Sequence, residues 1–169
     1  MKSIKYSLLI IISMAFAAIG FSQADSTAPL YVRFPTIPQF NIYNAKDSSI
    51  FTRENLKKKK QTVLILFSPD CEHCQHETKE LEANMSKFKN TQILMVTYLS
   101  YAQMEKFYND YHVADYPNII MGRDAKYFFP IYYKLKNMPS IFVYDKKGKF
   151  KKAFEGSVSV LKVAAELQN

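Results

Sequence analysis

The sequence predicts an α/β sandwich built on a mixed β-sheet. Two apolar runs, at 62–67 and 91–99, have the length and unbroken hydrophobicity of strands that are covered on both faces. Segments with helical spacing of apolar residues alternate with these runs. A Lys146-Lys147-Gly148 turn then joins two short apolar runs into an antiparallel pair near the C-terminus. Strands that alternate with helices and close with a hairpin and a helix are typical of a sheet with helices on both faces.

Each expected element in the first half of the chain has a local signal. In order, these elements are a strand at 39–43, a short helix from the N-cap Thr52 to the lysines at 57–60, a strand at 62–67 and a helix at 71–88. The last helix carries Leu81, Met85 and Phe88 at three- and four-residue spacing, so this face is expected to point into the core.

The second half continues the alternation. Its expected elements are a strand at 91–99, a helix from the N-cap Ser100 to Tyr111, a strand at 118–121, a helix at 124–135, strands at 140–145 and 150–154, and a final helix capped by Ser157. No internal repeat or second domain is visible. We therefore expect one domain over 39–169, preceded by an extended, proline-bearing segment at 25–38.

The N-terminus has the pattern of an export signal. Lys2 and Lys5 form a basic start, 8–19 is apolar, and Ser22-Gln23-Ala24 offers small residues for cleavage. The apolar run is shorter than the roughly 20 residues of a membrane-spanning helix. We expect 1–24 to be a signal peptide and the protein to be exported to the periplasm. An uncleaved segment would instead tether the domain to the membrane, facing the periplasm.

The charge pattern does not indicate nucleic acid as a partner. The formal net charge is +8, and removal of 1–24 takes away two lysines and no acid, which leaves +6. The lysine runs at 57–60 and 146–152 have no clear aromatic interleaving and coincide with expected turns, so a solvated face is predicted. Four glycines in the whole chain also argue against a phosphate-cradling loop.

The only two cysteines, Cys71 and Cys74, are two residues apart and open a predicted helix after a strand and a Ser68-Pro69-Asp70 turn. A cysteine at a helix N-terminus lies near unpaired N–H groups and the positive end of the helix dipole, which favour thiolate. The second cysteine, one turn on, is placed to attack a mixed disulfide and release product. We expect a redox dithiol with no cofactor other than its own Cys71–Cys74 disulfide.

Other uses of the cysteines are weaker. A static disulfide across so short a loop would stabilise the fold little. Zinc could use His73 or His76, but only His112 is left as a distant ligand. Haem attachment is excluded because Gln75 follows the second cysteine. The alternative function from another class is a metal-binding or copper-delivery module that uses the Cys/His cluster.

Four features together resemble the thioredoxin superfamily and its exported TlpA/ResA-like branch. They are the strand-turn-Cys-x-x-Cys-helix, Met138-Pro139-Ser140 before an apolar strand, the Asp145-Lys146-Lys147-Gly148 hairpin and Gly156 before the last helix. The resemblance covers roughly 40–168. It implies a thioredoxin-like three-layer sandwich, with a mixed central sheet flanked by helices and a β-α insertion of TlpA/peroxiredoxin type at 118–135.

The resemblance also implies an activity. An extracytoplasmic thiol–disulfide oxidoreductase of this branch exchanges disulfides with protein substrates and draws electrons from a membrane thiol donor. Cys71 would be the nucleophile and Cys74 its buried partner. Pro139 would be cis and face the dithiol, and its loop would present backbone groups of Met138 to the substrate.

Three further residues bear on redox tuning and proton transfer. His73 lies where oxidising relatives such as DsbA have a thiolate-stabilising histidine, and Glu72 would oppose it by repelling a thiolate. Glu77 has the offset of a proton-handling glutamate in the cytochrome c maturation reductases of this branch. A surface Glu77 that pairs with Lys79 or Lys87 remains an alternative. We expect a reductase rather than an oxidase.

Two positions depart from the thioredoxin pattern. Ile65 replaces a buried aspartate, and Asp70 stands where an aromatic residue is frequent. Proton transfer to the buried thiol therefore cannot use the usual acid, which favours Glu77 in that role. A peroxiredoxin site is disfavoured because Ser68 replaces the threonine before a peroxidatic cysteine, and the upstream proline is missing.

Overall fold

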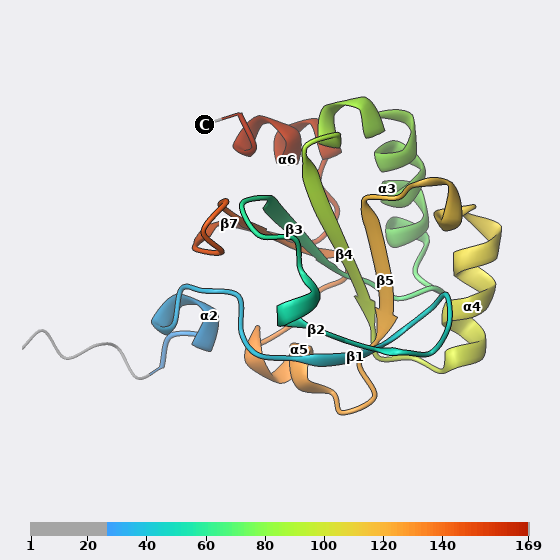
Figure 1. Ribbon diagram of the computed structural model, residues 1–169, viewed down its shortest axis with the longest axis horizontal. Coiled ribbons are helices and arrows are strands. Elements are labelled where there is room, and N and C mark those ends of the chain that lie inside the picture. Colours follow the sequence, from blue (N-terminus) through green and yellow to red (C-terminus); the bar gives the residue numbers. More distant parts are fainter. Residues whose placement is uncertain (1–26, 169) are drawn as a thin grey trace, which may run out of the picture.

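The centre of the molecule is one seven-stranded sheet with the order β2-β1-β5-β4-β3-β6-β7 (Figure 1). The computed structural model describes residues 27–168. The strands are β1 (Asn41–Asn44), β2 (Ile50–Thr52), β3 (Gln61–Leu66), β4 (Thr91–Thr97), β5 (Ile119–Arg123), β6 (Ser140–Tyr144) and β7 (Phe150–Glu155). Strands β3, β4 and β5 are parallel, and the pairings of β1 and β6 with them are antiparallel. The predicted mixed sheet is confirmed.

Helices cover both faces of this sheet. They are α2 (Leu30–Arg33), α3 (Glu72–Ala83), α4 (Tyr101–Asp110), α5 (Phe128–Tyr132) and α6 (Val160–Glu166), with 3₁₀ turns η1 (Arg53–Asn55), η2 (Met85–Phe88) and η3 (Val113–Asp115). Helices α3, α4 and α6 contribute to one core cluster, and α2 and α5 contribute to the other (Figure 1). The arrangement is a three-layer sandwich, as predicted.

Strand β3 shows why the sequence forms a central strand. Val63 and Ile65 belong to the core cluster under α3, α4 and α6, whereas Leu64 and Leu66 belong to the opposite cluster. Neighbouring side chains of a strand point to opposite faces, so a strand covered on both sides must be apolar throughout. β3 pairs with β4 and β6, which leaves it no free edge.

Several predicted helices are shorter than expected. The helix at 71–88 ends at Ala83, and Asn84 leads into the separate turn η2. The helix expected at 124–135 is only α5, because Tyr127 has a left-handed φ of 56° and Asp124 accepts the backbone N–H of Phe129 at 2.8 Å. Local side-chain bonds to the backbone thus replace the first turns of the expected helix.

Three other predictions need correction. The last helix begins after Ser159, whose Oγ accepts the N–H of Leu161 at 3.3 Å, and not after Ser157. The helix after Thr52 is the single turn η1, which ends before the lysines. The segment at 25–38 is not simply extended: in its described part, Tyr31 on the turn α2 is buried against the aromatic core.

The predicted signal peptide at 1–24 lies outside the described residues. Within residues 27–168, no helix combines the length and apolar character that crossing a membrane requires.

Candidate active site

The two cysteines lie at the start of α3, after the loop that follows β3. Cys71 is the N-cap residue and is partly exposed, whereas Cys74 is 2% exposed. Both are free thiols. The backbone N–H of Ser68 donates to Cys74 Sγ at 3.5 Å. Burial raises the pKa of the Cys74 thiol far above its ordinary value, so this thiol keeps its proton at neutral pH.

The loop before Cys71 is held by side chains from two helices. Gln75 Nε2 donates to the carbonyl oxygen of Pro69 at 2.8 Å, and Gln103 Nε2 donates to Asp70 Oδ2 at 2.6 Å. Gln103 also completes a capping box with Ser100 at the start of α4. Neither glutamine was predicted from the sequence to support this loop. The Ser-x-x-Gln spacing at 100–103 was a signal for the capping box but not for the bond to Asp70.

The loop before β6 reaches the same place. Leu66 at the end of β3 pairs with Ser140 at the start of β6, so Pro139 lies beside the strand end that leads to the cysteines. The Met138–Pro139 peptide bond is cis, which confirms the expectation from the resemblance. Cys71 Sγ donates to the carbonyl oxygen of Met138 at 3.8 Å. The structure therefore brings together Cys71, Cys74, Met138 and Pro139.

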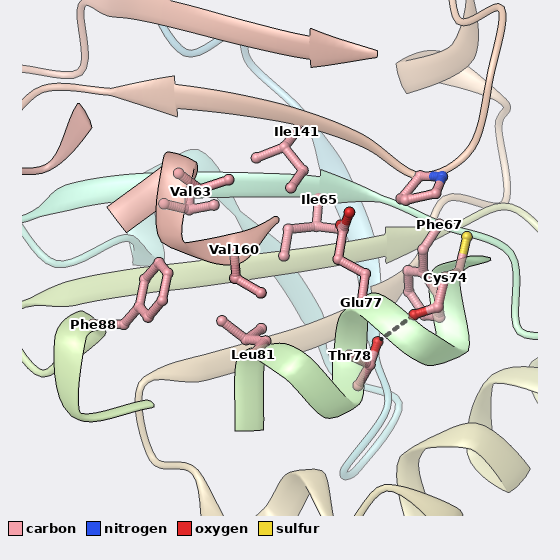
Figure 2. A pocket seen from close by; sticks show the side chains of 12 residues that line it. Val63, Ile65, Phe67, Cys74, Glu77, Thr78, Leu81, Phe88, Ile141 and Val160 are labelled. Carbon is pink, nitrogen blue, oxygen red and sulfur yellow. Dashed lines mark hydrogen bonds between the residues drawn. The ribbon is translucent and has the colours of Figure 1, made fainter. Parts of the chain in front are cut away.

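Glu77 is buried directly behind the dithiol. Its side chain is 4% exposed, Oε2 accepts the N–H of Val158 at 3.3 Å, and Oε1 has no hydrogen-bond partner within the described residues. Figure 2 shows the carboxylate reaching from α3 toward Ile65, with Val160 and Cys74 on the wall of the same cavity. The alternative of a surface glutamate paired with a lysine is wrong.

This environment changes the chemistry of the carboxyl group. Burial raises the pKa of Glu77 from 4.5 to about 7, and the bond from Val158 only partly offsets the effect. The charge of Glu77 in turn contributes to the raised pKa of Cys74, after the larger effect of burial. The enclosed cavity that both residues line has a volume of about 10 Å³. A carboxyl group whose pKa burial raises to about 7 thus lines the same cavity as the thiol of Cys74.

Ile65 occupies the position where the thioredoxin pattern has a buried aspartate. It is 5% exposed and lines the cavity with Glu77 and Cys74 (Figure 2). The apolar side chain of Ile65 helps to desolvate Glu77. Thr78, the next residue of α3, donates its hydroxyl to the carbonyl oxygen of Cys74 at 2.8 Å and is bound within the helix.

The remaining predicted tuning residues face solvent. Glu72 and His73 are exposed on the first turn of α3, and His76 is exposed on the next. His112 lines a groove with Pro69, Asp70 and Gln75 and does not join the cysteines. Over residues 27–168, no three His, Cys, Asp or Glu side chains gather in a group that could hold a metal ion.

Comparison with known proteins agrees with this geometry. The model of the AhpC/TSA family matches residues 35–153. Curated protein sequences give no significant match. Among solved structures, the peroxidoxin BcpB from Mycobacterium tuberculosis has a TM-score of 0.67 and 14% identity, over 79% of this chain and 94% of that chain.

Two further solved structures have a similar fold. The putative thiol:disulfide interchange protein DsbE from Chlorobium tepidum has a TM-score of 0.62 and 21% identity, over 78% of this chain and 90% of that chain. StoA from Bacillus subtilis has a TM-score of 0.58 and 17% identity, over 78% of this chain and 98% of that chain. These likenesses confirm the thioredoxin-like fold.

The family match includes the cysteine pair and the sheet from β1 into β7. It confirms the predicted class of enzyme, a thiol–disulfide oxidoreductase of the thioredoxin superfamily. The chain belongs to the AhpC/TSA family.

Proposed function

We propose that this protein is an extracytoplasmic reductase of protein disulfides that works through Cys71 and Cys74. One observation carries the proposal: a partly exposed thiol at a helix start faces the Met138–Pro139 loop, and a buried thiol lies one turn behind it. Only Cys71 is open to a macromolecular disulfide. Ser68, in place of a peroxidatic threonine, favours disulfide exchange over peroxide reduction.

The reaction takes two exchanges. The Cys71 thiolate attacks a substrate disulfide, an S–S bond forms between Cys71 and the substrate, and the displaced substrate sulfur leaves as a thiolate that takes up a proton. Cys74 then loses its proton and attacks Cys71 Sγ, which releases the second substrate thiol. Two electrons pass to the substrate and the enzyme is left with the Cys71–Cys74 disulfide. A membrane thiol donor would reduce this disulfide again.

Glu77 is the proposed proton acceptor for Cys74. Its buried carboxylate lines the same cavity, and burial raises its pKa to about 7, so it can take a proton from the thiol at neutral pH and return it in the next cycle. The Met138 carbonyl, which now accepts from Cys71, would be offered to an extended substrate segment once Cys71 reacts. Haem-binding apoproteins of cytochrome c maturation and mispaired protein disulfides are the proposed substrate classes.

The test is reduction of insulin by the reduced protein. Cys71→Ser should abolish turnover, because no exposed nucleophile remains. Cys74→Ser should accumulate a mixed disulfide, visible on a non-reducing gel, because release fails. Glu77→Gln should slow release and remove a rate increase near pH 7, while leaving the first attack unchanged. Full activity of the Cys71→Ser protein would overturn the assignment.

The direction of electron flow is tested by the redox midpoint. We expect a value between about −270 mV, as in thioredoxin, and about −120 mV, as in DsbA. His73→Pro should shift it to more negative values, because the variant loses the side chain proposed to stabilise the thiolate of Cys71 and with it the reduced form. An unchanged or more positive midpoint would show that His73 does not tune the site.

Bound metal in the purified protein would support the metal-binding alternative instead.

Export is the remaining part of the proposal. It rests on the basic start, apolar run and small residues of 1–24. N-terminal sequencing of the mature protein separates the two outcomes, because cleavage after Ala24 gives a free periplasmic domain and an intact N-terminus gives a tethered one.

A further inference from the structure

A basic groove lies at the end of the sheet remote from the dithiol. It has a volume of about 350 Å³ and is lined by the lysines at 57–60, Lys146, Lys147 and Arg53, with no Asp or Glu among the described residues of its wall. β3 starts at Gln61, directly after the first lysine run, and runs toward Cys71. A six-residue strand spans about 20 Å, so the groove and the dithiol are well separated.

The first lysine run is held in place by a buried side chain of β4. Gln92 is 3% exposed, and its Nε2 donates to the carbonyl oxygen of Lys57 at 3.1 Å and to Thr62 Oγ1 at 2.9 Å. The N–H of Lys57 donates back to Gln92 Oε1 at 2.8 Å. Lys59 turns the chain with a left-handed φ of 61°. These contacts fix the backbone conformation of the lysine loop.

The second run is fixed by the β6–β7 hairpin and by the N-terminal segment. Asp145 Oδ1 accepts the N–H groups of Lys147 at 2.7 Å and Lys149 at 2.8 Å, so this carboxylate is already engaged by the hairpin backbone. The N–H of Ile37 donates to the carbonyl oxygen of Gly148 at 3.0 Å. Segments far apart in the sequence thus form one preorganised wall.

Most of the positive charge of the groove has no ion-pair partner among the described residues. Over residues 27–168, the ion pairs are Arg53–Glu54 and Lys106–Asp110, so none of the six groove lysines takes part in one. Gathering like charges in one concavity raises the local potential, and a bound anion would relieve their repulsion.

We propose that the basic groove binds a phosphate-bearing anion. Lysine ammonium groups act as compact point charges that suit phosphate oxygens, and several of them together favour a ligand with more than one negative charge. No aromatic side chain lines the groove, so the stacking that holds nucleic-acid bases is missing from its wall. The phosphate could come from a soluble polyphosphate or from anionic lipid headgroups.

The first experiment titrates inorganic tripolyphosphate into the full chain by calorimetry. Lys58→Gln/Lys146→Gln removes one exposed lysine from each run and should weaken binding about tenfold. The control Lys87→Gln/Lys89→Gln removes the same charge from exposed sites outside the groove and should change affinity less than about twofold. Equal losses in both variants would overturn the site.

The second experiment distinguishes the sources. Sedimentation with phosphatidylcholine vesicles measures any contribution of residues 1–26, and phosphatidylglycerol vesicles add the anionic headgroup. Extra binding to phosphatidylglycerol that only the groove variant loses supports a lipid source, and tripolyphosphate binding alone supports a soluble one. If wild-type protein binds neither, the proposal is wrong. Insulin reduction by the groove variant should be unchanged, so failure of this site leaves the dithiol assignment unaffected.

Discussion

At the scale of single residues, Glu77 is the group whose properties depend most on the fold. It lies on a helix whose average composition is polar, and the next residues along the chain include Lys79 and Glu80. Nothing in that neighbourhood predicts burial. The side chain is buried because α3 packs against β3 and α6, which places Ile65 and Val160 around the carboxylate.

The first prediction is that stability depends on the ionisation of Glu77. Its pKa is raised from 4.5 to about 7, so between these values the folded state holds a proton that the unfolded chain releases. The free energy of unfolding should therefore fall as the pH rises from 4.5 through 7, by an amount on the order of 3 kcal/mol. Glu77→Gln keeps an acceptor for Val158 and should lack this loss.

Urea unfolding at several pH values between 4.5 and 8 measures the effect. The free energy of unfolding of the wild type should fall relative to that of Glu77→Gln as the pH rises. Glu105→Gln, on an exposed position of α4, serves as the control and should follow the wild type. Parallel profiles for wild type and Glu77→Gln would mean that the pKa of Glu77 is the same in the folded and the unfolded chain.

The candidate site could be predicted from sequence where the chemistry is local. The spacing of Cys71 and Cys74 indicated a redox dithiol without any tertiary information. The Met-Pro pair before a strand, through the family resemblance, predicted that Pro139 is cis and faces the dithiol. Burial was decided by packing between distant elements, so the two alternatives for Glu77 stayed open. The hydrogen bond from Gln103 to Asp70 could not be predicted from local sequence, because it joins positions 33 residues apart.

At the scale of elements, helix starts show both the strength and the limit of local signals. Ser100 was predicted to cap a helix and does, with Oγ accepting the N–H of Gln103 at 3.3 Å. Ser157 was predicted as a cap, but Ser159 performs that role. Both serines fit the cap preference. Ser159 has an additional long-range contact, since its hydroxyl donates to Glu80 Oε1 on α3 at 2.7 Å.

The second prediction compares these two serines. Ser159→Ala removes the acceptor for Leu161 and the bond to Glu80, so the free energy of unfolding should fall by about 1 kcal/mol. Ser157→Ala changes an exposed residue before the helix and should alter it by less than about 0.5 kcal/mol. Urea unfolding of both variants at one pH suffices. A larger loss for Ser157→Ala would place the start of α6 two residues earlier.

At the scale of the whole molecule, the alternation of strands and helices was predictable because the spacing of apolar residues indicates each element. The pairing of strands at the β2 edge of the sheet was not predictable in this way. β1 and β2 pair with each other. β1 then joins β5 through Tyr43–Arg123 and Asn44–Gly122, which are far apart in the sequence. The meeting of two lysine runs in one groove is a similar consequence of topology.

The N-terminal segment likewise makes long-range contacts that its sequence did not predict. Its prolines predicted an extended segment at 25–38. The ring centroid of Tyr31, however, lies 5.0 Å from that of Phe142 and 5.1 Å from that of Phe150. It also stacks on Tyr133 at 5.5 Å. A side chain that is 8% exposed inside an aromatic cluster fixes its segment to the sheet.

The last prediction tests whether this segment is part of the domain. Tyr31→Ala removes a buried aromatic ring and should lower the free energy of unfolding by about 3 kcal/mol, whereas Tyr31→Phe keeps the ring contacts and should lower it by less than about 1 kcal/mol. Trypsin should also cut after the exposed Arg33 faster in Tyr31→Ala, because α2 loses its anchor. Urea unfolding and the rate of that cleavage are the measurements. If Tyr31→Ala matches the wild type in both, the segment contributes nothing to the stability of the fold, and its contacts with the aromatic core are passive.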